Sequence, residues 1–101
     1  LEKLITKYPK LQIICRDIID ETENEMVIIF GSYAKSSADK KSDIDVYIET
    51  EDRNLKQKIE NIHPDINVKI GPFKIQSNLI KEIIKNHIIL KGYARFYDYT
   101  R

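Results

Sequence analysis

Two aspartates are the residues of this chain whose type and spacing could do chemistry. Asp43 and Asp45 alternate with Ile44 and Val46, so on a β-strand both carboxylates would share one face, roughly 6.5 to 7 Å apart at the backbone. Such a pair can converge on one or two hard cations such as Mg²⁺, which prefers oxygen ligands. An exposed strand with an acidic outer face is the simpler alternative for an isolated pair.

A glycine–serine pair adds a phosphate-binding feature to this hypothesis. Gly31 and Ser32 directly follow the apolar residues 26–30. Glycine lets the backbone approach a ligand closely, and a short helix starting at Ser32 would direct free N–H groups toward an anion. Lys35 adds a positive charge one turn later, although each feature alone also fits an ordinary turn or a solvated loop. Together the features predict a metal-dependent nucleotide site, in which the turn holds phosphate and the carboxylates hold Mg²⁺.

The elements that would position these residues follow from the hydrophobic pattern. Helical spacing is expected near residues 1–8, 11–19, 32–38, 52–62 and from the N-cap Ser77 onward, and strands are expected at 26–30, 43–49 and 65–70. Residues 88–90 and 92–99 fit either a short strand or further helix. This order predicts an α/β (α+β) fold, with helices packed on one mixed β-sheet.

Composition sets further bounds on the kind of protein. The 101 residues predict a single domain covering residues 1–101, and the net charge of +1 gives no overall attraction to nucleic acid or membranes. There is no apolar run long enough to span a membrane and no signal-peptide pattern. The lone Cys15, surrounded by isoleucines, fits a buried thiol in a reducing compartment. We therefore expect a cytoplasmic protein.

At residues 30–46 the chain resembles the DNA-polymerase-β-like nucleotidyltransferase superfamily, in particular its minimal nucleotidyltransferases. The pattern of that family is an apolar residue, Gly-Ser, about ten residues, and then Asp-x-Asp between apolar residues. Phe30-Gly31-Ser32 and Ser42-Asp43-Ile44-Asp45-Val46 match it, with ten residues between Ser32 and Asp43. The small members often read Gly-Ser-x-Ala-Arg-Gly, whereas this chain keeps Ala34 and a basic Lys35 but has Ser36 in place of the later glycine.

The resemblance implies roles for individual residues. Gly31 and Ser32, with Lys35, would contact the phosphates of a nucleoside triphosphate, while Asp43 and Asp45 would hold two Mg²⁺ ions. These metals would stabilise the attacking and leaving oxygens as a nucleotidyl group passes to a hydroxyl and pyrophosphate is released.

A third carboxylate, on the next strand, normally completes this metal site. The matching position here, between Ile66 and Val68, is Asn67, whose neutral oxygen is a weaker ligand and a poor base. Asp65 is expected on the same face two residues earlier and could substitute as a metal ligand. Asn67 therefore places the activity of this chain in question.

Three functions remain as alternatives. The first is a Mg²⁺-dependent nucleotidyltransferase, using ATP, that modifies a protein partner. The resemblance implies an antitoxin whose partner is a protein of the HEPN class (the higher-eukaryote and prokaryote nucleotide-binding domain). The second is an impaired nucleotide-binding module that acts on its partner by contact. The third, less favoured, is a nucleic-acid-binding accessory domain that uses Lys35, Lys40 and Lys41. With so short a chain, the acceptor is expected to be a macromolecule or to bind across a homo-oligomer.

Overall fold

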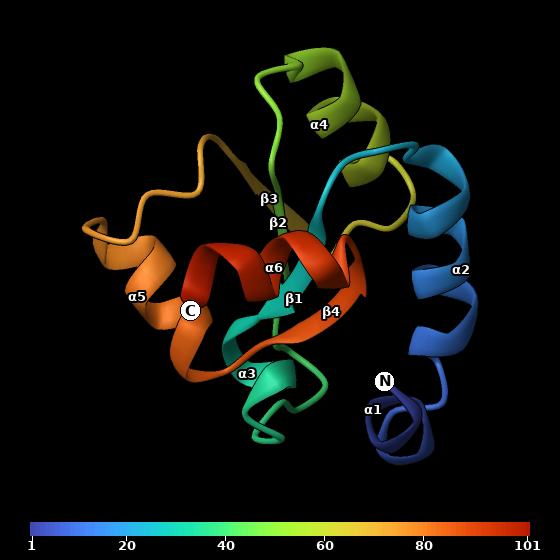
Figure 1. Ribbon diagram of the computed structural model, residues 1–101. Helices are drawn as coiled ribbons and strands as arrows, with labels where there is room; N and C mark the ends of the chain where they lie inside the picture. Colours follow the sequence, from blue (N-terminus) through green and yellow to red (C-terminus); the bar gives the residue numbers. More distant parts are fainter.

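The computed structural model describes all residues from Leu1 to Arg101. Six helices and four strands follow one another along the chain: α1 (Glu2–Lys7), α2 (Leu11–Glu21), β1 (Val27–Phe30), α3 (Gly31–Ala34), β2 (Ile44–Ile48), α4 (Arg53–Glu60), β3 (Ile66–Ile70), α5 (Asn78–Lys85), β4 (Ile88–Lys91) and α6 (Tyr93–Thr100). Figure 1 shows α2 on one side of the sheet and α6 crossing in front of β1 and β4. No helix is both long enough and apolar enough to cross a membrane.

The four strands form one mixed sheet in the order β3-β2-β1-β4. β1 pairs antiparallel with both β2 and β4, whereas β2 and β3 are parallel. A parallel pair needs a crossover connection, and α4 supplies it between β2 and β3. The mixed sheet with packed helices confirms the fold class predicted from the sequence.

Alternation along the strands divides the core between the two faces of the sheet. Val46 and Val68 point to one face, where α2 and α4 cover them, whereas Tyr47 and Ile28 point to the other, beneath α5 and α6. All four residues of β1 are buried, as expected of a strand with helices on both faces. The face beneath α5 and α6 is also the face that carries the two aspartates.

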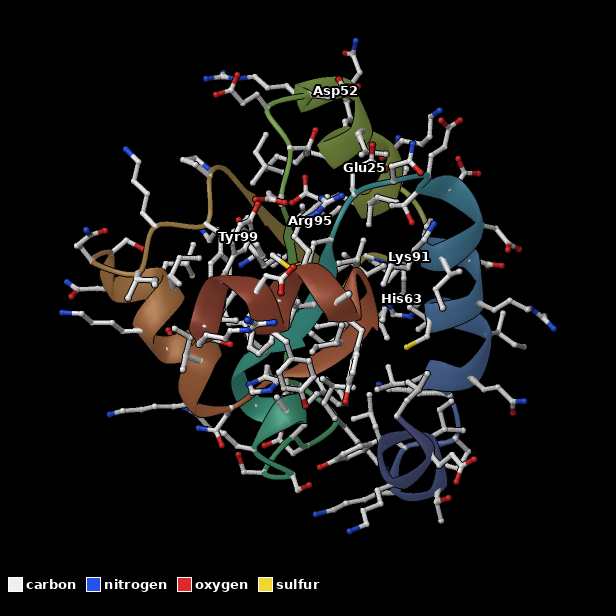
Figure 2. The ribbon with its side chains drawn as sticks, in the orientation of Figure 1. Glu25, Asp52, His63, Lys91, Arg95 and Tyr99 are labelled. Carbon is white, nitrogen blue, oxygen red and sulfur yellow. The ribbon has the colours of Figure 1, made fainter.

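Local capping explains where the later helices begin. The Asp52 carboxylate accepts hydrogen bonds from the backbone N–H groups of Asn54 and Leu55 at the start of α4 (Figure 2). The hydroxyl of Ser77 accepts from the N–H of Ile80 at 3.1 Å, so Ser77 is the N-cap that the sequence predicted. These side chains satisfy N–H groups that have no partner within a helix.

Two expectations need correction or completion. The segment after β1 was expected to form one or two helical turns over residues 32–38, but α3 is a single turn that already begins at Gly31. Its end is followed by Ser36 with φ +61, a left-handed conformation that ends a helix. Near the C-terminus the sequence fitted either a short strand or further helix, and the structure contains both: residues 88–91 form β4 and residues 93–100 form α6.

Lys91 links the last strand to the first long helix. Its ammonium group donates hydrogen bonds to the carbonyl oxygens of Thr22 (2.7 Å) and Ile19 (3.3 Å) at the C-terminal end of α2. Figure 2 shows this side chain between β4 and α2. A positive charge is favourable there because the last carbonyls of a helix lack partners and carry its negative dipole end.

Candidate functional site

The glycine–serine turn and the aspartate strand meet directly. Phe30, the last residue of β1, pairs with Asp45 of β2, and Gly31 follows with φ +70. A side chain at position 31 would overlap the Asp45 carboxylate, whose Cγ and Cβ would lie only 3.1 and 3.3 Å from the added carbon. Position 31 therefore requires glycine for two reasons: its backbone is left-handed, and the Asp45 carboxylate fills the space that a side chain would need.

The two aspartates differ in their surroundings. Asp43 is exposed just before β2, whereas Asp45 is partly buried within the strand. Burial is the main cause that raises the pKa of the Asp45 carboxyl, and the charges of Asp43 and Glu82 raise it further. A cluster of negative charge that is partly withdrawn from water is the environment that a bound cation would relieve.

Asn67 lies beside Asp45 on the neighbouring strand. The two residues are partners in the parallel β2–β3 register, and the Asn67 side chain, acting as a hydrogen-bond donor toward the Asp45 carboxyl, lowers the pKa of Asp45. An ionised carboxylate has no proton to donate and acts only as an acceptor, so the amide NH₂ group of Asn67 is the donor. The charge of Lys69, two residues further along β3, acts on Asp45 in the same direction.

Asp65 does not join the other two aspartates in the structure. It precedes β3, and its backbone N–H donates to His63 Nδ1 at 3.1 Å while its carboxylate lies 3.9 Å from the same nitrogen. No three acidic, histidine or cysteine side chains are grouped so that they could hold a metal ion. The metal-binding role of Asp65 therefore stays a prediction, as do those of Asp43 and Asp45.

A basic cavity of about 300 Å³ lies on the same side of the molecule as Asp45. It is lined by Lys35, which follows α3, and by residues of α5 and its C-terminal end: Asn78, Lys81, Glu82, Lys85 and Asn86. Lys35 was a sequence candidate, but Lys81, Glu82 and Lys85 were not. Charged residues on an amphipathic helix are typical of a solvated face, and only the fold shows that this helix ends beside the turn.

Ser32 and the short helix α3 limit how an anion could be held. Ser32 is half-buried in α3, which has four residues. A single turn has no appreciable macrodipole, so the attraction expected from a helix N-terminus is weaker than the sequence suggested. What remains are the N–H groups of the first turn, which have no partners within the helix, and the charge of Lys35.

Tyr47 is not available to a ligand, although the alternation of β2 placed it on the face of the aspartates. Its ring is buried, and its hydroxyl donates to the carbonyl oxygen of Gly71 at 2.7 Å. Burial is the main cause that raises the pKa of Tyr47. Tyr47 packs against residues of α5 and α6, which cover this part of the face.

These features define a domain with paired carboxylates beside a glycine turn and a basic cavity. The family model of polymerase β nucleotidyltransferases matches residues 13–95, and the chain belongs to this family. No curated protein is significantly similar to the chain.

Two solved structures have the same fold at low sequence identity. One is a chain of a Shewanella oneidensis complex between a tri-AMPylated HEPN toxin and an MNT antitoxin, with 20% identity and a TM-score of 0.56, covering 87% of this chain and 77% of the other. The other is a toxin–antitoxin structure with AMP-PNP, with 22% identity and a TM-score of 0.51, covering 83% of this chain and 72% of the other.

Proposed function

We propose that the protein is a Mg²⁺-dependent nucleotidyltransferase that transfers AMP from ATP to a hydroxyl group of a HEPN-type protein partner in a toxin–antitoxin module. Membership of the nucleotidyltransferase family supports the reaction class. The fold shared with chains from toxin–antitoxin structures, one with an AMPylated HEPN toxin and one with AMP-PNP, supports the nucleotide and the partner. The observation that carries the proposal is the direct apposition of Gly31 and Asp45.

The donors present fit Mg²⁺. Mg²⁺ is commonly bound by one or two carboxylates together with phosphate oxygens and water, and Asp43 and Asp45 supply that number. The raised pKa of Asp45, caused first by burial and then by neighbouring negative charge, is consistent with a carboxylate cluster that a cation stabilises. Bound there, Mg²⁺ would neutralise phosphate charge and stabilise the attacking and leaving oxygens. A second ion has weaker support, since Asn67 offers no third carboxylate.

The remaining residues bind and orient the nucleotide. The backbone of Gly31 and Ser32 contacts the phosphates, and Lys35, Lys81 and Lys85, which line one cavity, neutralise the charge of the triphosphate. An acceptor oxygen then bonds to the α-phosphorus while the bond to the bridging oxygen of the β-phosphate breaks. Pyrophosphate leaves, and the acceptor proton passes to water.

Transfer of label from α-labelled ATP to a purified HEPN-type partner tests this proposal. Wild type should label the partner only when Mg²⁺ is present, and Asp43→Asn with Asp45→Asn should reduce labelling by at least about a hundredfold. Asp20→Asn, an exposed site on α2, is the control and should label like wild type. Labelling that survives the double substitution would show that the site is assigned wrongly.

The second candidate is a module that binds ATP and restrains its partner without transfer. The position of Asn67, a neutral side chain beside Asp45, favours it. In the same assay this module would bind ATP with Mg²⁺ and block the partner while no label is transferred. Binding of nucleic acid by the lysines alone would instead depend steeply on salt and need no Mg²⁺.

A further inference from the structure

The outer edge of β3, the neighbour of the aspartate strand β2, is not paired with another strand. β3 is the last strand of the sheet on that side. The carbonyl of Asp65 accepts from the N–H of Ile44 at 2.8 Å, so alternation directs the backbone groups of Ile66, Val68 and Ile70 away from β2. The N–H of Ile66 already donates to the carbonyl oxygen of His63 at 3.1 Å, so the outward groups of Val68 and Ile70 are the part of this edge that can act as a template for pairing with another strand.

A side chain, rather than another strand, occupies this edge. The N–H of Val68 donates to Glu60 Oε2 of α4 at 3.0 Å, and Glu60 also lies 3.5 Å from the ammonium group of Lys56. A glutamate can rotate away without unfolding its helix, because its side chain is joined through freely rotating bonds. The edge is therefore closed by a group that a competing backbone could displace.

The space beside this edge is a polar groove of about 600 Å³ between α4 and β3. Its lining contains three basic residues, Arg53, Lys56 and Lys69, and a single acidic residue, Glu60. The basic groups outnumber the acidic one, so the groove is positively charged overall. A groove of this sign favours a segment that is acidic.

The groove also leads to the candidate site. Asp45 and Asn67 are paired across β2 and β3, so an added strand would place its own residue next in that row, on the same face of the sheet. Strand spacing puts that residue about 10 Å from the backbone of Asp45, a gap that long side chains on both sides can bridge. Lys69 connects the groove with the candidate site, because its side chain lines the groove and its charge lowers the pKa of Asp45.

We propose that an extended, acidic segment of the protein acceptor binds along β3 as an added strand, displacing Glu60 from the N–H of Val68. Backbone pairing with the edge gives affinity, and the basic groove selects acidic segments. The added strand then presents its acceptor hydroxyl in the row of Asp45 and Asn67. The assignment of the segment to an acceptor and this last step rest on the proposed function, whereas the affinity of the β3 edge for an acidic strand does not.

A synthetic peptide of alternating Glu and Val residues with a central Tyr is the probe for binding, and the same peptide with Lys in place of Glu is its control. The acidic peptide should slow hydrogen exchange at the amides of Val68 and Ile70, and the basic peptide should not. Glu60→Ala removes the competing group and should tighten binding about fivefold, since one such hydrogen bond contributes about 1 kcal/mol. Glu51→Ala, at an exposed loop site, should not change it. Unchanged exchange at both amides, or equal slowing by both peptides, would overturn the proposal.

A kinetic experiment with the protein acceptor separates this inference from the proposed function. Arg53→Glu with Lys56→Glu should raise KM for the protein acceptor at least about tenfold and leave KM for ATP unchanged, while Lys74→Glu, an exposed residue away from the groove, changes neither. Melting temperatures establish that the variants fold. Absence of labelling by wild type would contradict the proposed function alone. Labelling with unchanged KM in the groove variant would contradict the strand-addition proposal alone.

Discussion

The Asp45 carboxylate of β2 lies directly against the α-carbon of Gly31, at the end of the neighbouring strand β1. The antiparallel register that pairs Phe30 with Asp45 creates this contact. The glycine turn and the acidic strand therefore form one structural unit, and a change on either side disturbs the other.

Gly31→Ala tests this contact. The new methyl group overlaps Asp45, and the backbone at φ +70 disfavours alanine, so we expect a loss of about 2 kcal/mol in stability and at least tenfold weaker binding of ATP with Mg²⁺. Thermal melting and calorimetry measure the two effects. Gly71→Ala is the matched control because φ is +145 but nothing lies within 4 Å of the added carbon. Equal loss of ATP binding in both variants would contradict the role of the contact.

Ser36→Gly should make the protein more stable. Ser36 is the only non-glycine residue with positive φ, at +61, and a left-handed conformation costs an L-residue about 1 kcal/mol. The gain in free energy of unfolding should be about 0.5–1 kcal/mol, because glycine also increases the freedom of the unfolded chain. Urea unfolding measures it. Ser37→Gly has no positive φ to relieve and should instead lower stability slightly.

Asn67→Asp should restore a third carboxylate beside Asp45. Without metal, the added like charge across the strand pair should destabilise the fold by up to about 1 kcal/mol. With Mg²⁺, the stabilisation should exceed that of wild type, because the ion binds the folded state through an added ligand. Melting temperatures with and without Mg²⁺ measure this difference, with Asn61→Asp, at an exposed position, as control. An identical response to Mg²⁺ in wild type and Asn67→Asp would contradict the prediction.

Lys81→Ala with Lys85→Ala tests the basic cavity. Each exposed charge contributes up to about 1 kcal/mol to an ionic contact, so the double variant should bind ATP about tenfold more weakly, and the difference should shrink at high salt. Titration calorimetry at two salt concentrations measures both effects. Lys3→Ala with Lys74→Ala removes the same charge from exposed sites elsewhere. Equal weakening in this control would assign the effect to net charge rather than to the cavity.

The stability of the protein should fall at high pH because the thiol of Cys15 is buried. Burial raises the pKa of the Cys15 thiol from 9.0 to about 11, whereas the unfolded chain loses this proton near pH 9. The contribution to stability is complete below pH 9 and is lost as the pH rises from 9 to 11, by up to about 2 kcal/mol. Unfolding curves over this range should fall more steeply for wild type than for Cys15→Ala. Parallel pH profiles would contradict the prediction.

Hydrophobic alternation predicted the elements that build the site. The pattern around Asp43 and Asp45 placed both on one face of a strand, and the run before Gly31 gave the buried neighbouring strand. These features are local, because the face to which a strand residue points follows from its immediate neighbours in the sequence. The strand beginning near Asp65 was found by the same pattern, although Asp65 itself lies in the turn that precedes β3.

Features that depend on packing between distant segments could not be read from the sequence. Tyr47 alternates like an outward residue, and only the placement of α5 and α6 shows that it is buried. Lys81 and Lys85 look like ordinary surface charges until the fold brings them to Lys35. The single turn of α3 is likewise set by its surroundings, where the Tyr8 ring packs 4.8 Å from that of Tyr33 and the Tyr8 hydroxyl accepts from the N–H of Ala38.

The position of β4 determines when the chain can finish folding during synthesis. β1 lies between β2 and β4, yet β4 is made about sixty residues after β1, and Lys91 then reaches back to the end of α2. Until residues 88–91 leave the ribosome, one side of the wholly apolar β1 has no neighbour. A nascent chain whose residues 88–91 are still held in the ribosome is therefore prone to self-association through this edge of β1.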